Sequence, residues 1–412
     1  MGLLTALAVR LAWAVIYPAK PVSDFHWYYE VGREIADGRG IAYLGHATAI
    51  RPPGYPLLVA FANVLSGNRL LADRLLTVAL GVGTVWLAYL IARIAFSSEL
   101  AGRVTLVLVA LFPNQIAYSN LIASEMPFTF FTLLGAWVLM RKRPGFAAYV
   151  GAGAAFGAAL LIRPQGVIAP TVVLVATTWR LGWKTVLRGT VLVCLVMGLL
   201  LAPWIIRNDA VFGKPVYSTI DGEGLLEGTF RGSELQGKLI KTSLKLVPET
   251  GNPVVDDGNR RRYAIRYIEA HPGRYVGEFP KKIATMYGGD SDAFRWTIEG
   301  LHGEHESSLL TWVTIGDTFY DVVLAMSLLG LCLLVIRHRG RRDHWLLPAM
   351  VVVITSLSYL PFLALQRYHV PLIPWLTMYA GALSTFVIRS KHTPPADFDG
   401  NNERSDTVQA AS

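Results

Sequence analysis

Long apolar stretches separated by short polar loops are the feature that most constrains the fold of this chain. Of its 412 residues, 53% are hydrophobic and only 16% are charged, whereas about a quarter of the residues in a typical soluble protein are charged. Because the apolar residues lie in runs near the ~20 residues that a helix needs to cross a bilayer, the sequence predicts an all-α polytopic membrane protein. We expect about ten membrane-spanning helices, at Gly2–Tyr17, Leu70–Phe96, Val104–Ala117, Met126–Met140, Phe146–Ile162, Gly166–Thr178, Val191–Ile206, Leu310–Ile336, Leu346–Leu363 and Val370–Ile388.

The segments between these stretches predict the domain organisation. We expect a transmembrane module over residues 1–206, with a first external loop at 18–69 that holds interfacial helices. Residues 207–309 are too polar to span and are predicted to form a small external subdomain, in which Arg260–Met286 is expected to be a membrane-surface helix interrupted at His271. Residues 310–389 supply the last spanning helices, and the polar segment 390–412 is expected to be a disordered cytoplasmic tail.

The first apolar stretch and the cysteines carry less information. Gly2–Tyr17 has no basic leader and no small-residue cleavage site, so it is predicted to be the first membrane-spanning helix rather than a signal peptide. Its shortness leaves open that the natural start of the protein lies upstream.

Cys194 and Cys332 both lie inside apolar runs and are expected to be small core residues rather than a disulfide.

The distribution of positive charge predicts the orientation of the chain. The net charge is +9, but much of it lies in short loops between apolar stretches, a placement typical of membrane topology rather than of nucleic-acid binding. The intervening short loops are poor in Lys and Arg, so the positive-inside rule predicts that the basic loops are cytoplasmic. The first loop and the 207–309 region are then extracytoplasmic. The basic loop residues are Arg103, Arg141, Lys142, Arg143, Arg180, Lys184, Arg188, Arg337, Arg339, Arg341 and Arg342.

Two carboxylates lie at the predicted outer boundary of the membrane. Asp24 follows the first helix, where a carboxylate can take a proton from a hydroxyl or amine that attacks a membrane-anchored substrate. Asp24 can also N-cap the next helix, and the two roles are compatible. Glu125 begins a spanning helix, where the helix dipole favours an acid. A lone charge at the bilayer edge is also expected to have a partner, so Glu125 could orient an acceptor or help hold a metal.

Four arginines lie at the predicted extracytoplasmic ends of helices, on the same side as the two carboxylates. Snorkelling explains any one of them, but the positive-inside rule disfavours so many on this side. Guanidinium groups bind phosphate in bidentate geometry and stabilise charge on a leaving phosphate. Arg10, midway along the first helix, also needs a partner. The sequence contains no internal repeat, glycine-rich nucleotide loop or Cys/His metal framework. The four arginines at helix ends are Arg51, Arg163, Arg207 and Arg367.

The order of several motifs resembles one family of membrane enzymes. Asp24 after the first helix, Tyr28 and Tyr29 on the next helix, and the sequence RPPGYP at 51–56 are similar to the first external loop of GT-C glycosyltransferases. The resemblance is to bacterial homologues of protein O-mannosyltransferase and of the lipid A aminoarabinose transferase. It continues through SEMPF at 124–128, LIRPQG at 161–166, PWIIRN at 203–208 and QRYHVPLIP at 366–374.

The resemblance implies a GT-C-like fold and the transfer of a sugar from a polyprenyl-phosphate carrier to a lipid, glycan or protein acceptor at the outer face of the cell membrane. Asp24 falls at the position of the family's catalytic first-loop acid, and Arg51 matches a basic residue that contacts the carrier phosphate. We predict Asp24 and Glu125 as catalytic residues, no certain cofactor, and no nucleic-acid partner, and leave a divalent metal open. The predicted donor-phosphate residues are Arg51, Tyr55, Arg163, Arg207, Arg367, Tyr368 and His369.

Two other classes of function are weighed against an inverting glycosyltransferase. A flippase or transporter of lipid-linked sugars usually has ionisable groups near the bilayer midplane and repeats between its halves, whereas here the charges gather at one interface. A structural subunit of an envelope assembly has no need for a positioned set of acids and bases. The sequence therefore favours the transferase, without naming its sugar or its acceptor.

Overall fold

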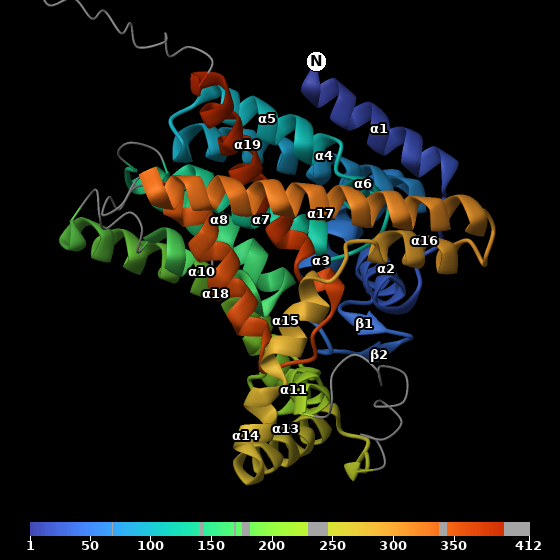
Figure 1. Ribbon diagram of the computed structural model, residues 1–412. Coiled ribbons are helices and arrows are strands. Elements are labelled where there is room, and N and C mark those ends of the chain that lie inside the picture. Colours follow the sequence, from blue (N-terminus) through green and yellow to red (C-terminus); the bar gives the residue numbers. More distant parts are fainter. Residues whose placement is uncertain are drawn as a thin grey trace, which may run out of the picture.

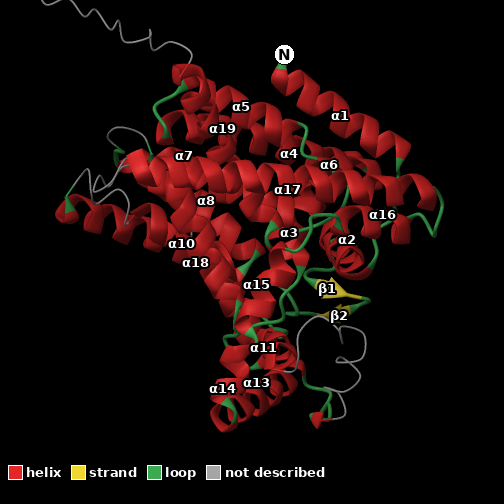
Figure 2. Ribbon diagram, viewed as in Figure 1, coloured by secondary structure: helices red, strands yellow, loops and turns green. Residues whose placement is uncertain are grey.

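The computed structural model describes residues 1–67, 69–140, 144–168, 170–174, 182–229, 246–337 and 344–390. Over these ranges the chain is helical except for one short β-hairpin and the connecting loops (Figures 1 and 2). The predicted tail beyond residue 390 and the basic residues at 141–143, 180 and 339–342 lie outside the described residues. The all-α prediction therefore holds for the membrane part, and the hairpin is its exception.

Within the part of the chain that the structure describes, three helices are long and apolar enough to cross a membrane, judged by length and composition. They are α4 (Leu70–Ala95), α10 (Trp183–Phe212) and α17 (Glu306–Arg337), and the last two are longer than predicted. Shorter helices occupy the other predicted stretches except Gly166–Thr178, of which residues 169 and 175–178 lie outside the described residues. They are α1 (Gly2–Ile16), α5 (Glu99–Ala110), α6 (Pro113–Tyr118), α7 (Glu125–Leu139), α8 (Phe146–Ile162), α18 (Leu347–Tyr359) and α19 (Ile373–Ser390), with short 3-10 turns η1 (Pro164–Val167), η2 (His344–Leu346), η3 (Gln366–Tyr368) and η4 (Val370–Leu372).

The predicted span Val104–Ala117 is wrong, because the chain breaks inside it. Helix α5 begins earlier, at Glu99, where the Ser98 side chain caps the helix by accepting from the Ala101 N–H. It ends at Ala110, and α6 starts at Pro113, whose ring cannot continue the preceding helix. The break leaves carbonyl groups without helical partners. The buried Arg10 donates to two of them, Val109 O at 3.3 Å and Ala110 O at 3.0 Å, which supplies the partner that this cation requires.

The cysteine prediction is correct in one part and wrong in the other. Cys194 and Cys332 are free thiols, as expected, but both are exposed rather than buried. They lie on α10 and α17, whose apolar surfaces are largely uncovered by the rest of the chain. Apolar residues on a membrane helix can face lipid as well as the protein core, and an apolar run alone does not distinguish the two.

The first external loop folds into two helices and the hairpin. Helices α2 (Ser23–Ala36) and α3 (Gly54–Ser66) pack against each other. Between them β1 (Ala42–Tyr43) pairs with β2 (His46–Ala47) in an antiparallel register of Ala42 with Ala47. Leu44 and Gly45 have φ angles of 51° and 80°, which suits a two-residue hairpin turn with two left-handed residues. The hairpin was missed because each strand has only two residues.

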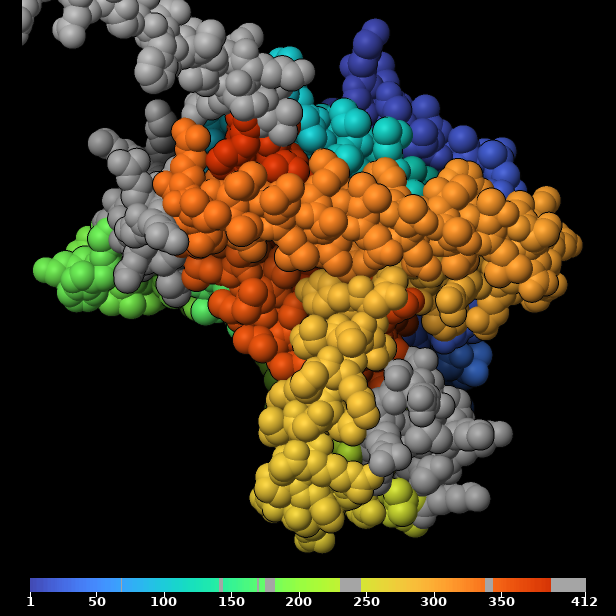
Figure 3. Space-filling view, in the orientation of Figure 1, coloured from blue at the N-terminus to red at the C-terminus, as the bar shows by residue number. Residues whose placement is uncertain are grey.

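The 207–309 region forms helices α11 (Asp221–Thr229), α13 (Pro253–Ala270), α14 (Pro272–Gly277), α15 (Phe279–Tyr287) and α16 (Asp292–Gly300). The interruption predicted at His271 is confirmed, because α13 ends at Ala270 and α14 begins at Pro272. Helices α11, α13 and α14 make the lobe at the bottom of Figure 1, which projects from the helical body in the space-filling view (Figure 3). The region contacts the first loop where Lys20 N–H donates to Gly300 O and Thr219 N–H to Ala49 O.

Helix α11 is held tightly against the end of α18. The Leu363 N–H donates to Gly224 O at 3.3 Å, and the buried Lys282 donates to Gly228 O at 2.8 Å and Leu360 O at 2.7 Å. Gly228 lies so close to this segment that a Cβ there would be 2.5 Å from Pro361 O. The glycine is therefore needed for the close approach of two backbones.

We expect Gly228→Ala to lower the free energy of unfolding by about 1–3 kcal/mol, because the added methyl group must push α11 away. The measurement is thermal unfolding of the purified protein in detergent. Gly224→Ala is the matched control on the same helix, since its Cβ would meet only Phe362 Cδ1 at an ordinary 3.6 Å. Alanine also favours a helix over glycine, so the control should be neutral or stabilised. Equal effects of the two substitutions would contradict this packing.

Candidate active site

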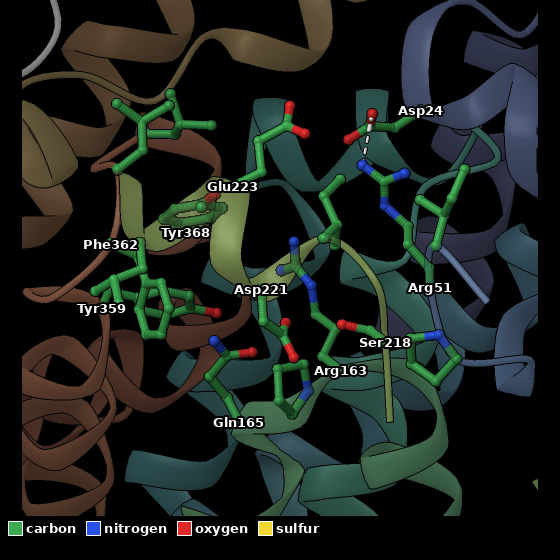
Figure 4. A pocket seen from close by; sticks show the side chains of 18 of the residues that line it. Asp24, Arg51, Arg163, Gln165, Ser218, Asp221, Glu223, Tyr359, Phe362 and Tyr368 are labelled. Carbon is green, nitrogen blue, oxygen red and sulfur yellow. Dashed lines mark hydrogen bonds and ion pairs between the residues drawn. The ribbon is translucent and has the colours of Figure 1, made fainter. Parts of the chain in front are cut away.

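A cavity of 930 Å³ lies between the first loop, the turn after α8, helix α11 and the segment that joins α18 to α19. The first loop and the last helices are far apart in sequence, yet both contribute charged side chains to its wall. Figure 4 shows Asp24 and Arg51 on one side of this space, Tyr359 and Tyr368 on the other, and Arg163 between them. Of the residues predicted from the sequence, Asp24, Arg51, Arg163, Arg367 and Tyr368 line the cavity.

Asp24 lies in the first turn of α2 but does not cap that helix. The N-cap residue is Val22, and no side chain makes a capping hydrogen bond there. The carboxylate instead accepts from Arg51 Nη2 at 2.9 Å and from Arg367 Nη1 at 3.0 Å, and the first of these bonds is drawn in Figure 4. The capping role considered for Asp24 is therefore excluded. Its side chain lines the cavity instead.

Burial opposes ionisation of Asp24, but the nearby positive charges outweigh it. Arg51 and Arg367, with a hydrogen bond from Arg367, hold the pKa of the Asp24 carboxyl below its usual value. Asp24 is thus a carboxylate at neutral pH in this arrangement. A carboxylate held in two ion pairs is a weak proton acceptor, since protonation would break favourable contacts with both arginines.

Glu125 lies behind the cavity rather than in its wall. It is the first residue of α7, is fully buried, and accepts from Arg163 Nη2 at 3.0 Å and Arg367 Nε at 2.8 Å. The partner expected for this lone charge is therefore present, twice over. Because Glu125 is not among the lining residues, its contacts favour a role in orienting the two arginines over direct contact with a substrate.

The arginines form a cluster with an uncompensated positive charge. Arg51, Arg163 and Arg367 face two carboxylates, and Arg367 bridges both of them. Among the described residues, Arg163 Nη1 is buried without a hydrogen-bond partner. Aromatic rings support the guanidinium groups, with Phe25 5.5 Å from Arg367 and Tyr368 5.8 Å from Arg163. Such a cluster, with a spare donor beside a cavity, can bind an oxyanion such as phosphate.

A proline follows two of these arginines and affects their backbone conformation. Arg51 and Arg163 each precede a proline, and a residue in that position is disfavoured in helical conformation. Arg163 accordingly ends α8 with an extended backbone, at φ −148° and ψ 142°. The side chain then leaves the helix axis and turns into the cavity. The Arg-Pro spacing noted in the sequence thus has a physical consequence at the site.

Three predicted donor-phosphate residues do not line the cavity. Arg207 donates to Thr48 O and Ile41 O, both at 2.8 Å, and so ties α10 to the first loop. Tyr55 is fully buried and its hydroxyl is 3.2 Å from Thr77 Oγ1. His369 is fully buried, with its ring nitrogens near Met286 O and Asp290 Oδ1. Their contacts are with the scaffold, whereas Tyr368 faces the cavity and stacks on Tyr359 at 4.5 Å.

The sequence analysis missed the part of the cavity wall that α11 and the residues before it supply. Its charged members include Asp221, Glu223 and Glu227, with Arg261 from α13. The i,i+4 spacing of Glu223 and Glu227 in the sequence DGEGLLEG is the signal that was available. Among the described residues, no group of at least three His, Cys, Asp and Glu side chains is placed to hold a metal ion.

Comparisons with known proteins show which family model and which folds this chain resembles. Residues 50–206 match the family model described as dolichyl-phosphate-mannose-protein mannosyltransferase. The search of curated proteins found no match. The fold is similar to the structure of ArnT from Cupriavidus metallidurans bound to undecaprenyl phosphate, with a TM-score of 0.56, 18% identity, and coverage of 92% of this chain and 59% of that one.

Two archaeal structures show the same likeness. The oligosaccharyltransferase from Archaeoglobus fulgidus in the apo form gives a TM-score of 0.57 at 13% identity, covering 95% of this chain and 50% of that one. The same type of enzyme, AglB, in complex with an inhibitory peptide and a dolichol-phosphate gives 0.55 at 13% identity, covering 98% and 52%. The chain thus spans only part of the length of these proteins. It is a multi-pass membrane protein with the GT-C glycosyltransferase fold, and its residues 50–206 match the dolichyl-phosphate-mannose-protein mannosyltransferase family.

Proposed function

We propose that this protein is an inverting membrane glycosyltransferase, which moves a sugar from a polyprenyl-phosphate carrier to a lipid, glycan or protein acceptor at the extracytoplasmic face of the cell membrane. The observation that carries the proposal is the cluster of Arg51, Arg163 and Arg367 beside Asp24 in one cavity. The matched family is named for a dolichyl-phosphate sugar donor. The ArnT and AglB structures contain undecaprenyl phosphate and dolichol-phosphate, respectively.

The arginine cluster suits the phosphate of such a donor. The cluster carries more positive than negative charge, so a phosphate that enters it brings the charges into balance. During transfer the bond between the anomeric carbon and the phosphate oxygen breaks, and the electron pair leaves with the phosphate. Guanidinium groups already in place stabilise that developing charge. A phosphate paired in this way leaves without a general acid.

Asp24 contributes negative charge next to the arginines. It keeps Arg51 and Arg367 side by side at 2.9 and 3.0 Å from its two oxygens. Glycosyl transfer passes through a state with positive charge on the sugar ring, which a nearby carboxylate stabilises. This role requires the charge of Asp24 and makes the residue catalytic.

A flippase for the same lipid-linked sugar is the alternative function. It would share the phosphate site, so binding of the carrier does not separate the two proposals, whereas cleavage of the donor does. The buried cation Arg10 gives no support to a transport path, because Ser119 Oγ and backbone carbonyls occupy its donors. The transferase remains the better account of a carboxylate placed among arginines at a cavity wall.

The phosphate site can be tested by the affinity for undecaprenyl phosphate. We expect Arg51→Ala to weaken binding by about 10- to 100-fold, the loss of one charge-assisted hydrogen bond, and Arg51→Lys to retain part of the affinity. The measurement is the Kd of purified protein in detergent, and Arg39→Ala is the control. Arg39 lies in the same loop but pairs with Glu34 and Asp37 and is half exposed. An unchanged Kd in Arg51→Ala would remove this arginine from the donor site.

A further inference from the structure

Glu227 is a carboxyl group in the cavity wall that neither the sequence motifs nor the arginine cluster accounts for. It lies one helical turn after Glu223 on α11 and is half-buried. Among the described residues it has no hydrogen bond or ion pair, in contrast to Asp24 and Glu125, which are each bound by two arginines. A carboxyl group that borders a cavity without a partner is available to a molecule that enters it.

The helix that carries Glu227 is fixed in place. Gly228 touches the Pro361–Phe362 backbone, and Lys282 donates to the Gly228 carbonyl. At the other end of α11, the Gly222 N–H donates to the Asp257 side chain. These contacts flank Glu227 and leave its side chain to the cavity. The position of Glu227 is therefore defined, and Glu227 and Asp24 line the same cavity.

The surroundings of Glu227 differ in charge from those of Asp24. Burial raises the pKa of Glu227 to about 7, and the negative charges of Glu223 and Asp24 act in the same direction, against a smaller opposite effect of Arg260. General acid–base catalysis is most effective when the catalytic pKa lies near the working pH. The charged groups that act on this carboxyl are Asp24 from α2, Glu223 from α11 and Arg260 from α13. Tyr368 from η3 and Arg261 from α13 also line the cavity, and Lys282 from α15 binds the carbonyl of the next residue, Gly228.

We infer that Glu227 is the proton acceptor for the attacking group, while Asp24 serves the donor side of the cavity. This inference rests on the proposed function. The oxygen or nitrogen of the acceptor forms a bond to the anomeric carbon, and the bond from that carbon to the phosphate oxygen breaks. The phosphate keeps the electron pair of the broken bond, and the proton of the acceptor passes to the Glu227 carboxylate. The products are the glycosylated acceptor, the polyprenyl phosphate and a protonated Glu227.

The other acids of α11 are less suited to this role. Glu223 is held by Arg260, whose Nη1 lies 3.0 Å from Glu223 Oε2. Arg260 also binds Glu249 at 2.8 Å. Glu223 is therefore part of an ion-pair network of three residues. Asp221 also has no hydrogen bond or ion pair among the described residues, but it lies at the start of α11, six residues before Glu227, and appears in Figure 4 near Gln165. Glu223→Gln is therefore a matched control, because it removes an acid that is already paired with Arg260 and leaves Glu227 in place.

The test compares Glu227→Gln with Glu223→Gln in transfer from radiolabelled undecaprenyl-phosphate mannose, with Ser/Thr peptides and solubilised membrane lipids as acceptors. We expect kcat to fall by about 100-fold or more in Glu227→Gln and by less than about 3-fold in Glu223→Gln, whose acid is already paired. In the wild type, kcat/KM should rise as the pH increases through about 7, because only the deprotonated carboxyl accepts a proton. This rise should disappear in Glu227→Gln.

A chemical rescue separates catalysis from structure. Added formate should restore part of the activity of Glu227→Ala and should not affect Asp24→Ala, whose carboxylate serves the arginines. The Kd for undecaprenyl phosphate should stay at the wild-type value in Glu227→Gln. If the wild type transfers sugar and Glu227→Gln keeps both its rate and its pH dependence, the inference is wrong and the proposed function stands. If the wild type binds the donor but never cleaves it, the proposed function itself fails.

Discussion

Asp24→Asn is expected to lower the rate of sugar transfer by at least about 100-fold, as the removal of one preorganised charge from an active site does, and to leave the protein folded. The amide keeps the size of the side chain but loses the charge that holds Arg51 and Arg367 at 2.9 and 3.0 Å. Since Asp24 does not cap α2, helix stability should not change. The rate is measured with radiolabelled undecaprenyl-phosphate mannose, and folding by thermal unfolding in the same detergent.

Asp37→Asn is the control for this substitution. Asp37 is at the other end of α2, pairs with Arg39, and is not part of the cavity wall. Its substitution should leave the rate within about 2-fold of the wild type, since exposed ion pairs contribute little. A transfer rate near that of the wild type in Asp24→Asn would mean that the arginine cluster works without this carboxylate, and the roles given to Asp24 would have to be abandoned.

Arg367→Met is expected to affect both stability and activity. Arg367 is buried and bridges Asp24 and Glu125. Its removal leaves the fully buried Glu125 with a single partner, and breaking a buried ion pair costs about 3–5 kcal/mol. Donor binding should be lost as well, because the bridge sets the positions of both carboxylates. Thermal unfolding and the Kd for undecaprenyl phosphate measure the two effects separately.

The double variant Arg367→Met with Glu125→Gln tests the reason for the loss. Removing the charge of Glu125 relieves the unpaired carboxylate, so part of the stability should return while donor binding stays low. Arg260→Met is a matched control, since Arg260 is also buried but its partners Glu223 and Glu249 are more exposed, and its loss should be smaller. A double variant no more stable than Arg367→Met would show that the buried charge is not the source of the instability.

The helices were largely predictable because the bilayer imposes long apolar segments, and most predicted stretches became helices within a few residues. Where the prediction failed, short-range effects had decided the structure. Pro113 ended a helix inside the apolar run 104–117, and the turn at Leu44 and Gly45 made a hairpin from strands of two residues each. Neither event changes the mean hydropathy over a long window, which is the quantity that predicts a spanning helix.

The candidate site was predictable in part. Topology predicts which residues lie near each other, whereas it does not predict which side chains point into the cavity. The arginines and Asp24 stand at helix ends on one side of the chain, so topology alone brings them near each other. Which side chains reach the cavity depends on the phase of each helix and turn. For this reason Arg207, Tyr55 and His369 lie in the scaffold, while Tyr368 lies in the cavity wall. Glu227 was missed because its helix has only nine residues and packs through Gly222 and Gly228, so the sequence shows no long apolar pattern there.

The most direct test of the account is the fate of the donor. Purified wild-type protein is incubated with radiolabelled undecaprenyl-phosphate mannose and the acceptor mixture, and the products are separated and their anomeric configuration determined. The account predicts a labelled acceptor whose sugar has the configuration opposite to that in the donor, with one undecaprenyl phosphate released for each sugar transferred. In sealed vesicles, movement of intact donor across the membrane without cleavage would contradict it, as would a product that retains the donor's configuration.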